Sequence, residues 1–202
     1  MENNYAAIVR DNLNRFYEEQ RKDAAEAMGA RLEGDADFVF TAFGAPCRIS
    51  PDGIQLGDQL ETDVLGILIS LYAIHAQPVE PVLTPYRAFK EIPNAFPYVG
   101  AFASHAESIL VPHVETIFNR KAEIVAALDG GEAPPAMGGD LAFRVRPLPK
   151  IHLLYIFYRA DEDFPASATC LFSRNADVFL PVDGLADTGE YTSRTIRTLI
   201  GA

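Results

Sequence analysis

Apolar residues follow two different periods along this chain. Spacing near that of an α-helix predicts helices over four segments, Asn4–Met28, Glu61–Gln77, Ala101–Leu128 and Gly184–Ile200. Short apolar runs between turn residues predict a three-stranded antiparallel meander within Asp37–Leu56. Further strands are predicted at Leu141–Arg146, Ile151–Arg159, Ser167–Phe172 and Val178–Leu180.

The segment Glu61–Gln77 has almost no polar face, which predicts a helix that is buried on most sides. Gly29 is placed to end the first helix, and Pro112 should break the third. The proline-dense stretch after Gln77 is expected to be irregular, with one helical turn at Tyr86–Lys90. Its apolar residues, Val82, Leu83, Phe89, Ile92 and Phe96, are expected to pack against the core.

Together these elements predict an α+β protein that forms a single globular domain over residues 1–202. The expected architecture is an antiparallel or mixed sheet packed by helices, including the largely buried helix at about 61–77. The early and late strands fit one sheet or two, and we favour one sheet of mixed order around that helix.

The net charge of −11 would repel a polyanion, so the composition argues against nucleic acid and membrane partners. Cys47 and Cys170 cannot build a four-cysteine cluster, and their apolar surroundings predict buried thiols without a disulfide. We predict no cofactor. The first residues lack the features of a signal peptide, and no apolar run reaches the ~20 residues that span a bilayer, which predicts a cytoplasmic protein.

Three adjacent carboxylates, Asp161, Glu162 and Asp163, lie in a hairpin between two apolar strands. They could bind a hard metal ion or a polar ligand. The favoured alternative is a solvated turn whose carboxylates accept backbone N–H groups, with the ring of Phe164 folded back on the core. No histidine pair has the spacing of a metal site, and no metal is predicted.

Arg144 and Arg146 should share one face of a strand, where they could bind an anion or pair with surplus carboxylates such as the acidic hairpin. We favour the pairing. The candidate ligand-binding residues are Arg87, Glu91, Asp140, Arg144, Arg146, Asp161, Glu162 and Asp163.

The last third of the chain carries a recurrent pattern: Leu148-Pro149-Lys150-Ile151-His152-Leu153, then Asp161-Glu162-Asp163-Phe164-Pro165-Ala166, Leu171-Phe172 and Leu180-Pro181. Phe89-Lys90-Glu91-Ile92-Pro93 and Gly138-Gly139-Asp140 precede it. The chain resembles the DUF3786 family, a domain of unknown function found in anaerobic bacteria and archaea.

Some members of that family are fused to an iron–sulfur module, so the resemblance implies a setting of redox or corrinoid chemistry. The chain departs from the family pattern in three respects. It lacks a cysteine-rich module, Ser173 stands where an aspartate is expected, and Asn94-Ala95 replaces a glycine-rich turn.

The leading interpretation is a non-catalytic accessory module that binds a small ligand or a partner, the partner being a redox or corrinoid protein. One alternative is a metal-dependent enzyme that uses the acidic hairpin, with Asp140 as a further ligand and Arg144 or Arg146 binding an anionic substrate. Another is a structural role in which the strand Leu153–Tyr158 pairs across the twofold axis of a homodimer.

Overall fold

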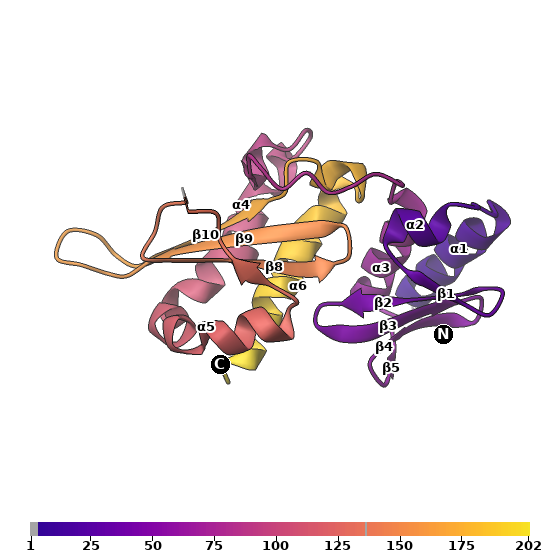
Figure 1. The fold of residues 1–202 in the computed structure, drawn as a ribbon, viewed down its shortest axis with the longest axis horizontal. Coiled ribbons are helices and arrows are strands. Elements are labelled where there is room, and N and C mark those ends of the chain that lie inside the picture. The colour runs from indigo at the N-terminus through magenta and orange to yellow at the C-terminus, as the bar shows by residue number, and fades with distance from the viewer. Residues whose placement is uncertain (1–3, 136) are drawn as a thin grey trace.

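The computed structural model describes residues 4–135 and 137–202 and has two antiparallel sheets, each with helices packed on one face (Figure 1). This confirms an α+β fold with helices on antiparallel sheets. The favoured single sheet of mixed order is wrong, since the early and late strands form separate five-stranded sheets. The strands of the first sheet pair with their neighbours in sequence, and the buried helix and the proline-dense stretch separate them from the late strands. The second sheet is completed by a long-range pairing, in which Arg87–Ala88 of the proline-dense stretch pairs with Leu171–Phe172.

The first half of the chain contains α1 (Asn4–Glu18), α2 (Ala24–Met28), β1 (Arg31–Glu33), β2 (Asp37–Ala42), β3 (Ala45–Ser50), β4 (Gly53–Leu56), β5 (Gln59–Leu60) and α3 (Val64–His75). The predicted first helix is thus two helices, because the chain turns at Gln20, whose φ is 44°. Gly29 ends α2 in the left-handed conformation, as predicted. The predicted meander is present and is widened by β1 and β5 at its edges.

Helix α3 is the predicted buried helix. It begins where the Asp63 side chain accepts a hydrogen bond from the Leu65 amide at 3.0 Å, which satisfies a free donor of the first turn. Its Tyr72 hydroxyl donates to the Met28 carbonyl at 2.7 Å and accepts from the Lys150 amide at 3.1 Å. This one buried side chain therefore joins the two halves of the molecule.

The proline-dense stretch contains β6 (Arg87–Ala88) and the 3-10 turns η1 (Phe89–Glu91) and η2 (Phe96–Tyr98). Phe89 and Ile92 are buried, as expected. The expectation is wrong for Phe96, which is 92% exposed, and for Val82, which is also exposed. Prolines hold this stretch on the surface, where only some of its apolar side chains reach the core.

The second half continues with α4 (Val99–Phe102), the π-helical turn η3 (Ala103–Glu107), the 3-10 turn η4 (Ser108–His113), α5 (Val114–Ala127), β7 (Gly131–Glu132), β8 (Leu141–Leu148), β9 (Ile151–Tyr158), β10 (Ser167–Phe172), η5 (Ala176–Val178) and α6 (Val182–Leu199). The predicted break near Pro112 is confirmed, since η4 separates the π turn from α5. The predicted strand Val178–Leu180 is wrong, because the chain forms η5 and a turn there.

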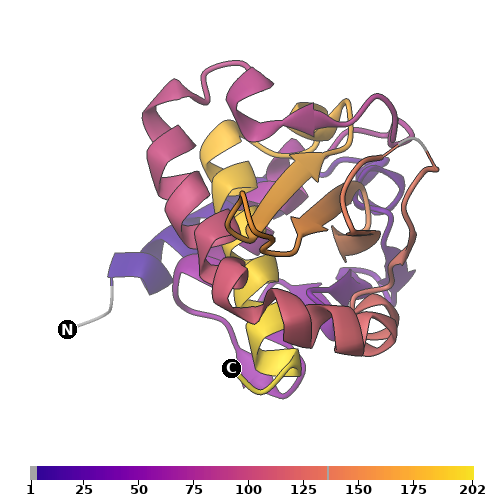
Figure 2. The same cartoon turned by 90° about the vertical axis from the view of Figure 1, so that its left-hand side faces the viewer.

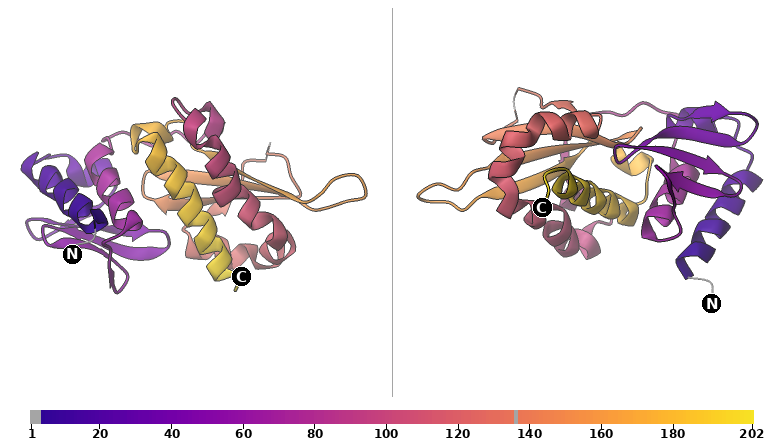
Figure 3. Two further views of the ribbon diagram at one scale, coloured as in Figure 1. Left: turned by 180° about the vertical axis from the view of Figure 1, so that it is seen from behind. Right: turned by 90° about the horizontal axis from the view of Figure 1, so that it is seen from below.

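The second sheet has the order β6-β10-β9-β8-β7. Its inner face carries buried residues such as Phe143, Tyr155 and Phe172, and α6 lies against this face beside the helical segments that follow residue 99 (Figures 2 and 3). Strand β9 is central, with β10 and β8 on its two edges. The proposed pairing of Leu153–Tyr158 across a homodimer axis is therefore wrong, because both of its edges are already hydrogen-bonded.

The two halves meet along a continuous apolar core. The Phe43 amide donates to the Pro147 carbonyl at 2.7 Å, which ties the β2–β3 turn to the end of β8. Whether both halves unfold as a unit, as the single-domain prediction requires, stays a prediction. Within the described ranges, no helix is long and apolar enough to cross a membrane.

Candidate functional site

Basic side chains gather on the outer face of the second sheet, opposite the helices. Arg144 and Arg146 alternate along β8 with the buried residues Phe143 and Val145. Because side chains in a strand alternate between faces, both guanidinium groups project away from the core. His152 on β9 alternates with buried Leu153 in the same way, so it joins the arginines on the outer face.

A cleft of about 330 Å³ opens beside these residues, where the two halves of the molecule meet. It is lined by Gly29, Glu80, Pro81, Leu83, Arg146, Pro149, Lys150 and His152, and we call it the junction cleft. The lining comes from the end of α2, the proline-dense stretch and the β8–β9 turn. A Cβ atom on Gly29 would lie 2.9 Å from the Cβ of Pro149, so glycine permits this close approach.

The basic groups at the cleft have partners that remain in contact with water. Arg146 forms an ion pair with Asp129, and Lys150 reaches Glu80 at 3.1 Å although Glu80 is 90% exposed. The Arg144 Nε donates to the Glu132 backbone carbonyl at 2.8 Å, which brings no compensating charge. The Arg146–Asp129 pair is exposed on both sides, and such pairs contribute little, so a competing ligand can displace Asp129. Lys150 is itself buried and also donates to the Val79 carbonyl at 3.2 Å.

The pKa of His152 reflects the burial and the positive charge of this face. Burial, together with the positive charges of Arg146 and Arg144, lowers the pKa of His152 to about 4. Its imidazole is therefore neutral at pH 7 and has one donor and one acceptor nitrogen.

The other predicted site residues are spread over the second half of the chain. Arg87 pairs with Asp177 at 2.5 Å, and the Glu91 carboxylate accepts from the Ala88 amide at 2.8 Å. Asp140 accepts from the Arg159 amide at 2.8 Å. The Arg87 pair joins β6 to η5 across the sequence, whereas the Glu91 and Asp140 contacts stabilise a turn and a strand end. Of the predicted set, the structure brings together only Arg144 and Arg146.

The acidic hairpin lies at the far end of β9 from the cleft, in the long loop at the left of Figure 1. The Asp161 carboxylate accepts from the Asp163 amide at 2.9 Å and from the Phe164 amide at 2.7 Å, which is the geometry of a solvated turn. The expected packing of Phe164 on the core is wrong, since its side chain is 70% exposed. Arg144 and Arg146 contact the segment 129–132, and not this hairpin.

Cys47 and Cys170 are buried free thiols, as predicted. Burial, together with the nearby Glu61 carboxylate, raises the pKa of Cys47 to about 12. In the part of the chain that the structure describes, no group of three or more histidine, cysteine, aspartate or glutamate side chains is placed to hold a metal ion.

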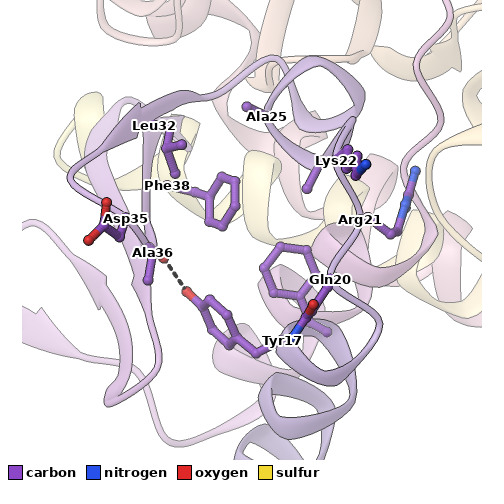
Figure 4. A pocket seen from close by; sticks show the side chains of 11 residues that line it. Tyr17, Gln20, Arg21, Lys22, Ala25, Leu32, Asp35, Ala36 and Phe38 are labelled. Carbon is purple, nitrogen blue, oxygen red and sulfur yellow. Dashed lines mark hydrogen bonds between the residues drawn. The ribbon is translucent and has the colours of Figure 1, made fainter.

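A larger hollow, of about 410 Å³, lies in the first half between α1, α2 and the β1–β2 hairpin (Figure 4). Its floor is an edge-to-face cluster in which Phe16 contacts Tyr17 and Phe38. Its two best-buried polar side chains already have partners: the Tyr17 hydroxyl donates to the Ala36 carbonyl at 2.7 Å, and Arg21 donates to the Ile74 and Ala76 carbonyls. We therefore favour the junction cleft as the candidate site, despite its smaller volume.

Reasoning from the sequence missed His152 and Lys150 as members of the site. The alternation of His152 with Leu153 was visible in the sequence, but its proximity to Arg146 depends on the register between β8 and β9. Glu80 and Gly29 carried no signal, because they come to the cleft from distant parts of the chain.

No curated protein and no solved structure matches the chain. A family model, described as a domain of unknown function, matches residues 20–195. The match covers both sheets and every residue of the junction cleft. The resemblance that the sequence motifs indicated is thereby confirmed, and the chain belongs to the DUF3786 family.

Proposed function

We propose that this protein is a non-catalytic binding module that holds a small polar ligand in the junction cleft. The observation that carries the proposal is the composition of the cleft wall, to which Gly29, Glu80 and Arg146 contribute from three separate segments. A ligand in such a position contacts both halves of the molecule, and ligands commonly bind where structural units meet.

The module has an accessory role in anaerobic redox or corrinoid-linked metabolism in the cytoplasm. Its partner is a redox or corrinoid protein. The family resemblance supports the metabolic setting and the partner, and the junction cleft supports the binding of a small polar ligand. The alternative of a metal-dependent enzyme gains no support from the acidic hairpin, whose Asp161 carboxylate is engaged by its own turn.

The proposal is tested by thermal unfolding of the purified protein in the presence of a panel of small polar metabolites. A ligand that binds only the folded state stabilises it by about 2.7 kcal/mol at a hundred times its dissociation constant. We expect at least one compound to raise the melting temperature, and Arg146→Ala to abolish the increase.

Arg120→Ala is the matched control. Both arginines are ion-paired on the surface, with side chains 42% exposed for Arg146 and 38% for Arg120, but Arg120 lies on α5 and pairs with Glu123. The control should respond to the ligand like the wild type. A panel without any stabilising compound, or an equal loss in both variants, would contradict the proposal.

A further inference from the structure

Two buried hydroxyl groups on the outer face of the second sheet lack hydrogen-bond partners among the described residues. They are the phenol of Tyr86, which is 8% exposed, and the hydroxyl of Ser173, which is 0% exposed. A buried polar group without a partner is costly because it has given up its hydrogen bonds to water, so native proteins have few of them. Two such groups on one face of one sheet therefore require an explanation.

The pairing of the strands places Ser173 next to His152. Phe172 pairs with Leu153, and the next amide, that of Ser173, donates to the His152 carbonyl at 2.9 Å. Since side chains alternate along paired strands, Ser173 and His152 share the outer face.

Tyr86 reaches the same face from the opposite edge of the sheet. Arg87 on β6 pairs with Phe172, so Tyr86, one residue earlier, points to the side of Ser173. Burial raises the pKa of Tyr86, while the nearby Arg144 guanidinium acts to lower it. Part of this lowering comes from a polar contact between the phenol and the guanidinium, although their geometry falls short of a well-formed hydrogen bond.

The charged groups around these hydroxyls are predominantly basic. Arg144, Arg146 and Lys150 face the region, and the acids that face it, Asp129 and Glu80, are largely exposed. His152 is neutral at pH 7. In a chain with a net charge of −11, this is a local reversal of sign. Each guanidinium has five N–H donors, and one contact to Asp129 or to the Glu132 carbonyl leaves most of them available.

We propose that this face binds an oxyanion, the phosphate or carboxylate group of a small molecule, between Arg144, Arg146 and the hydroxyls of Ser173 and Tyr86. The inference rests on the proposed function of the junction cleft, to whose lining this site is joined through Arg146, and it names the class of the ligand. The arginines supply charge and the hydroxyls donate hydrogen bonds to the anionic oxygens, which are the strong kind of hydrogen bond. The anion thus supplies acceptors for both unpartnered hydroxyls.

Entry requires a local shift, because both hydroxyl oxygens are closed to solvent. The cleft-lining segment 79–83 is the neighbouring element best placed to move. It is held by polar contacts: the Val82 carbonyl accepts from the Arg174 amide and the Val82 amide donates to Asn175, each at 2.7 Å. Asn175 also donates to the Glu80 carbonyl at 3.1 Å, and Lys150 donates to the Val79 carbonyl at 3.2 Å and pairs with the Glu80 carboxylate. Val79 and Val82 are exposed, so displacing the segment opens little apolar surface.

The test is calorimetric titration of the full chain with inorganic phosphate and, separately, with malonate at the same ionic strength. The two probes distinguish a phosphate ligand from a carboxylate ligand. We expect at least one of them to bind the wild type, and Ser173→Ala or Tyr86→Phe to weaken that binding about tenfold each, as the loss of one hydrogen bond to a charged group predicts.

Ser173→Asp places a carboxylate inside the site and should abolish binding of either probe. Ser167→Ala is the control, since Ser167 is an exposed serine at the other end of β10 and should leave the affinity unchanged. Thermal unfolding of each variant establishes that it is folded before it is titrated.

A measurement on the wild type is independent of any variant. Titration of the His152 ring by NMR should show its pKa rising from about 4 when the bound probe adds negative charge nearby. An unchanged His152 pKa at saturation, failure of both probes to bind, or equal effects of Ser173→Ala and Ser167→Ala would each overturn the inference.

Failure of this inference is distinguishable from failure of the binding-module proposal. Suppose that a metabolite from the panel stabilises the protein through Arg146, while phosphate, malonate and the hydroxyl variants have no effect. The binding-module proposal is then kept and the oxyanion site is rejected. If no compound on the panel raises the melting temperature, both the binding module and the oxyanion site are rejected.

Discussion

The two sheets of this protein have the same plan, an antiparallel five-stranded sheet with helices on one face, but they treat charge on the opposite face differently. On the first sheet, Arg48 is held by two carboxylates, Asp37 at 2.7 Å and Glu33 at 2.6 Å. On the second sheet, within the described part of the chain, Arg146 has one exposed carboxylate partner, whereas Arg144 donates to a backbone carbonyl and lies near the Tyr86 phenol without a carboxylate partner. On the first face, the charge of Arg48 is balanced by carboxylates. The second face retains positive charge and hydroxyl groups without well-formed hydrogen bonds beside a cleft.

This contrast separates a structural surface from a candidate binding surface on one architecture. Basic residues alone do not distinguish them, since both faces carry arginine. The distinction lies in whether the fold supplies counter-charges from neighbouring strands.

The largest expected effects come from the cores under the two sheets. Phe157→Ala in the second sheet and Ile49→Ala in the first should each lower the free energy of unfolding by about 2–5 kcal/mol, because both side chains are fully buried. If the continuous core makes one cooperative unit, each variant shifts a single common transition in calorimetry. Two separate transitions would show that the sheets are independent domains, and the exposed Leu60→Ala is the control, with little effect.

A second prediction uses the pH dependence of stability. The pKa of His152 is lowered to about 4 in the folded state, against about 6.5 in the unfolded chain, so the unfolded state binds more protons between these values. The stabilisation is complete above pH 6.5 and is lost as the pH falls toward 4, amounting to about 3 kcal/mol.

The measurement is urea denaturation from pH 7 to pH 4 of the wild type and of His152→Gln, in which the group cannot titrate. The difference in unfolding free energy between the two proteins should shrink by about that amount as the pH falls. A constant difference would mean that His152 is as easily protonated in the folded protein as in the unfolded chain.

A third prediction concerns the contact between the two halves. Tyr72→Phe removes the hydroxyl that joins Met28 to Lys150, and it leaves a buried carbonyl and a buried amide without this partner. We expect a loss of about 1–3 kcal/mol in chemical denaturation, together with faster hydrogen exchange at the Lys150 amide. Tyr98→Phe, on an exposed residue, should leave both unchanged.

The smallest expected effects test the charge contrast directly. Arg48→Ala leaves Glu33 and Asp37 facing each other and should lower the melting temperature, whereas Arg146→Ala relieves crowding among basic groups and should lower it less. High salt should narrow the gap between the two variants, because these groups are near the surface. Equal melting temperatures at low salt would remove the electrostatic difference between the faces.

Several features were predictable because they depend on local sequence. Periodicity of apolar residues predicted α3 and the strands of the first meander. Backbone preferences of single residues predicted the left-handed conformation of Gly29 and the break near Pro112. Motifs in the last third identified the family. The end of α1 was missed because a positive φ at Gln20 has no strong signal in the sequence.

The sequence by itself determined most of the helices and strands, the α+β class and the pair of arginines on one strand face. These depend on alternation and on turn chemistry within a few residues. Only the tertiary structure decided that the strands form two sheets, that Asp129 and not the acidic hairpin pairs with Arg146, and that His152, Ser173 and Tyr86 lie on the face of the arginines. The physical reason is that strand register and long-range packing are set by the whole core, and a cleft between distant segments has no pattern along the chain.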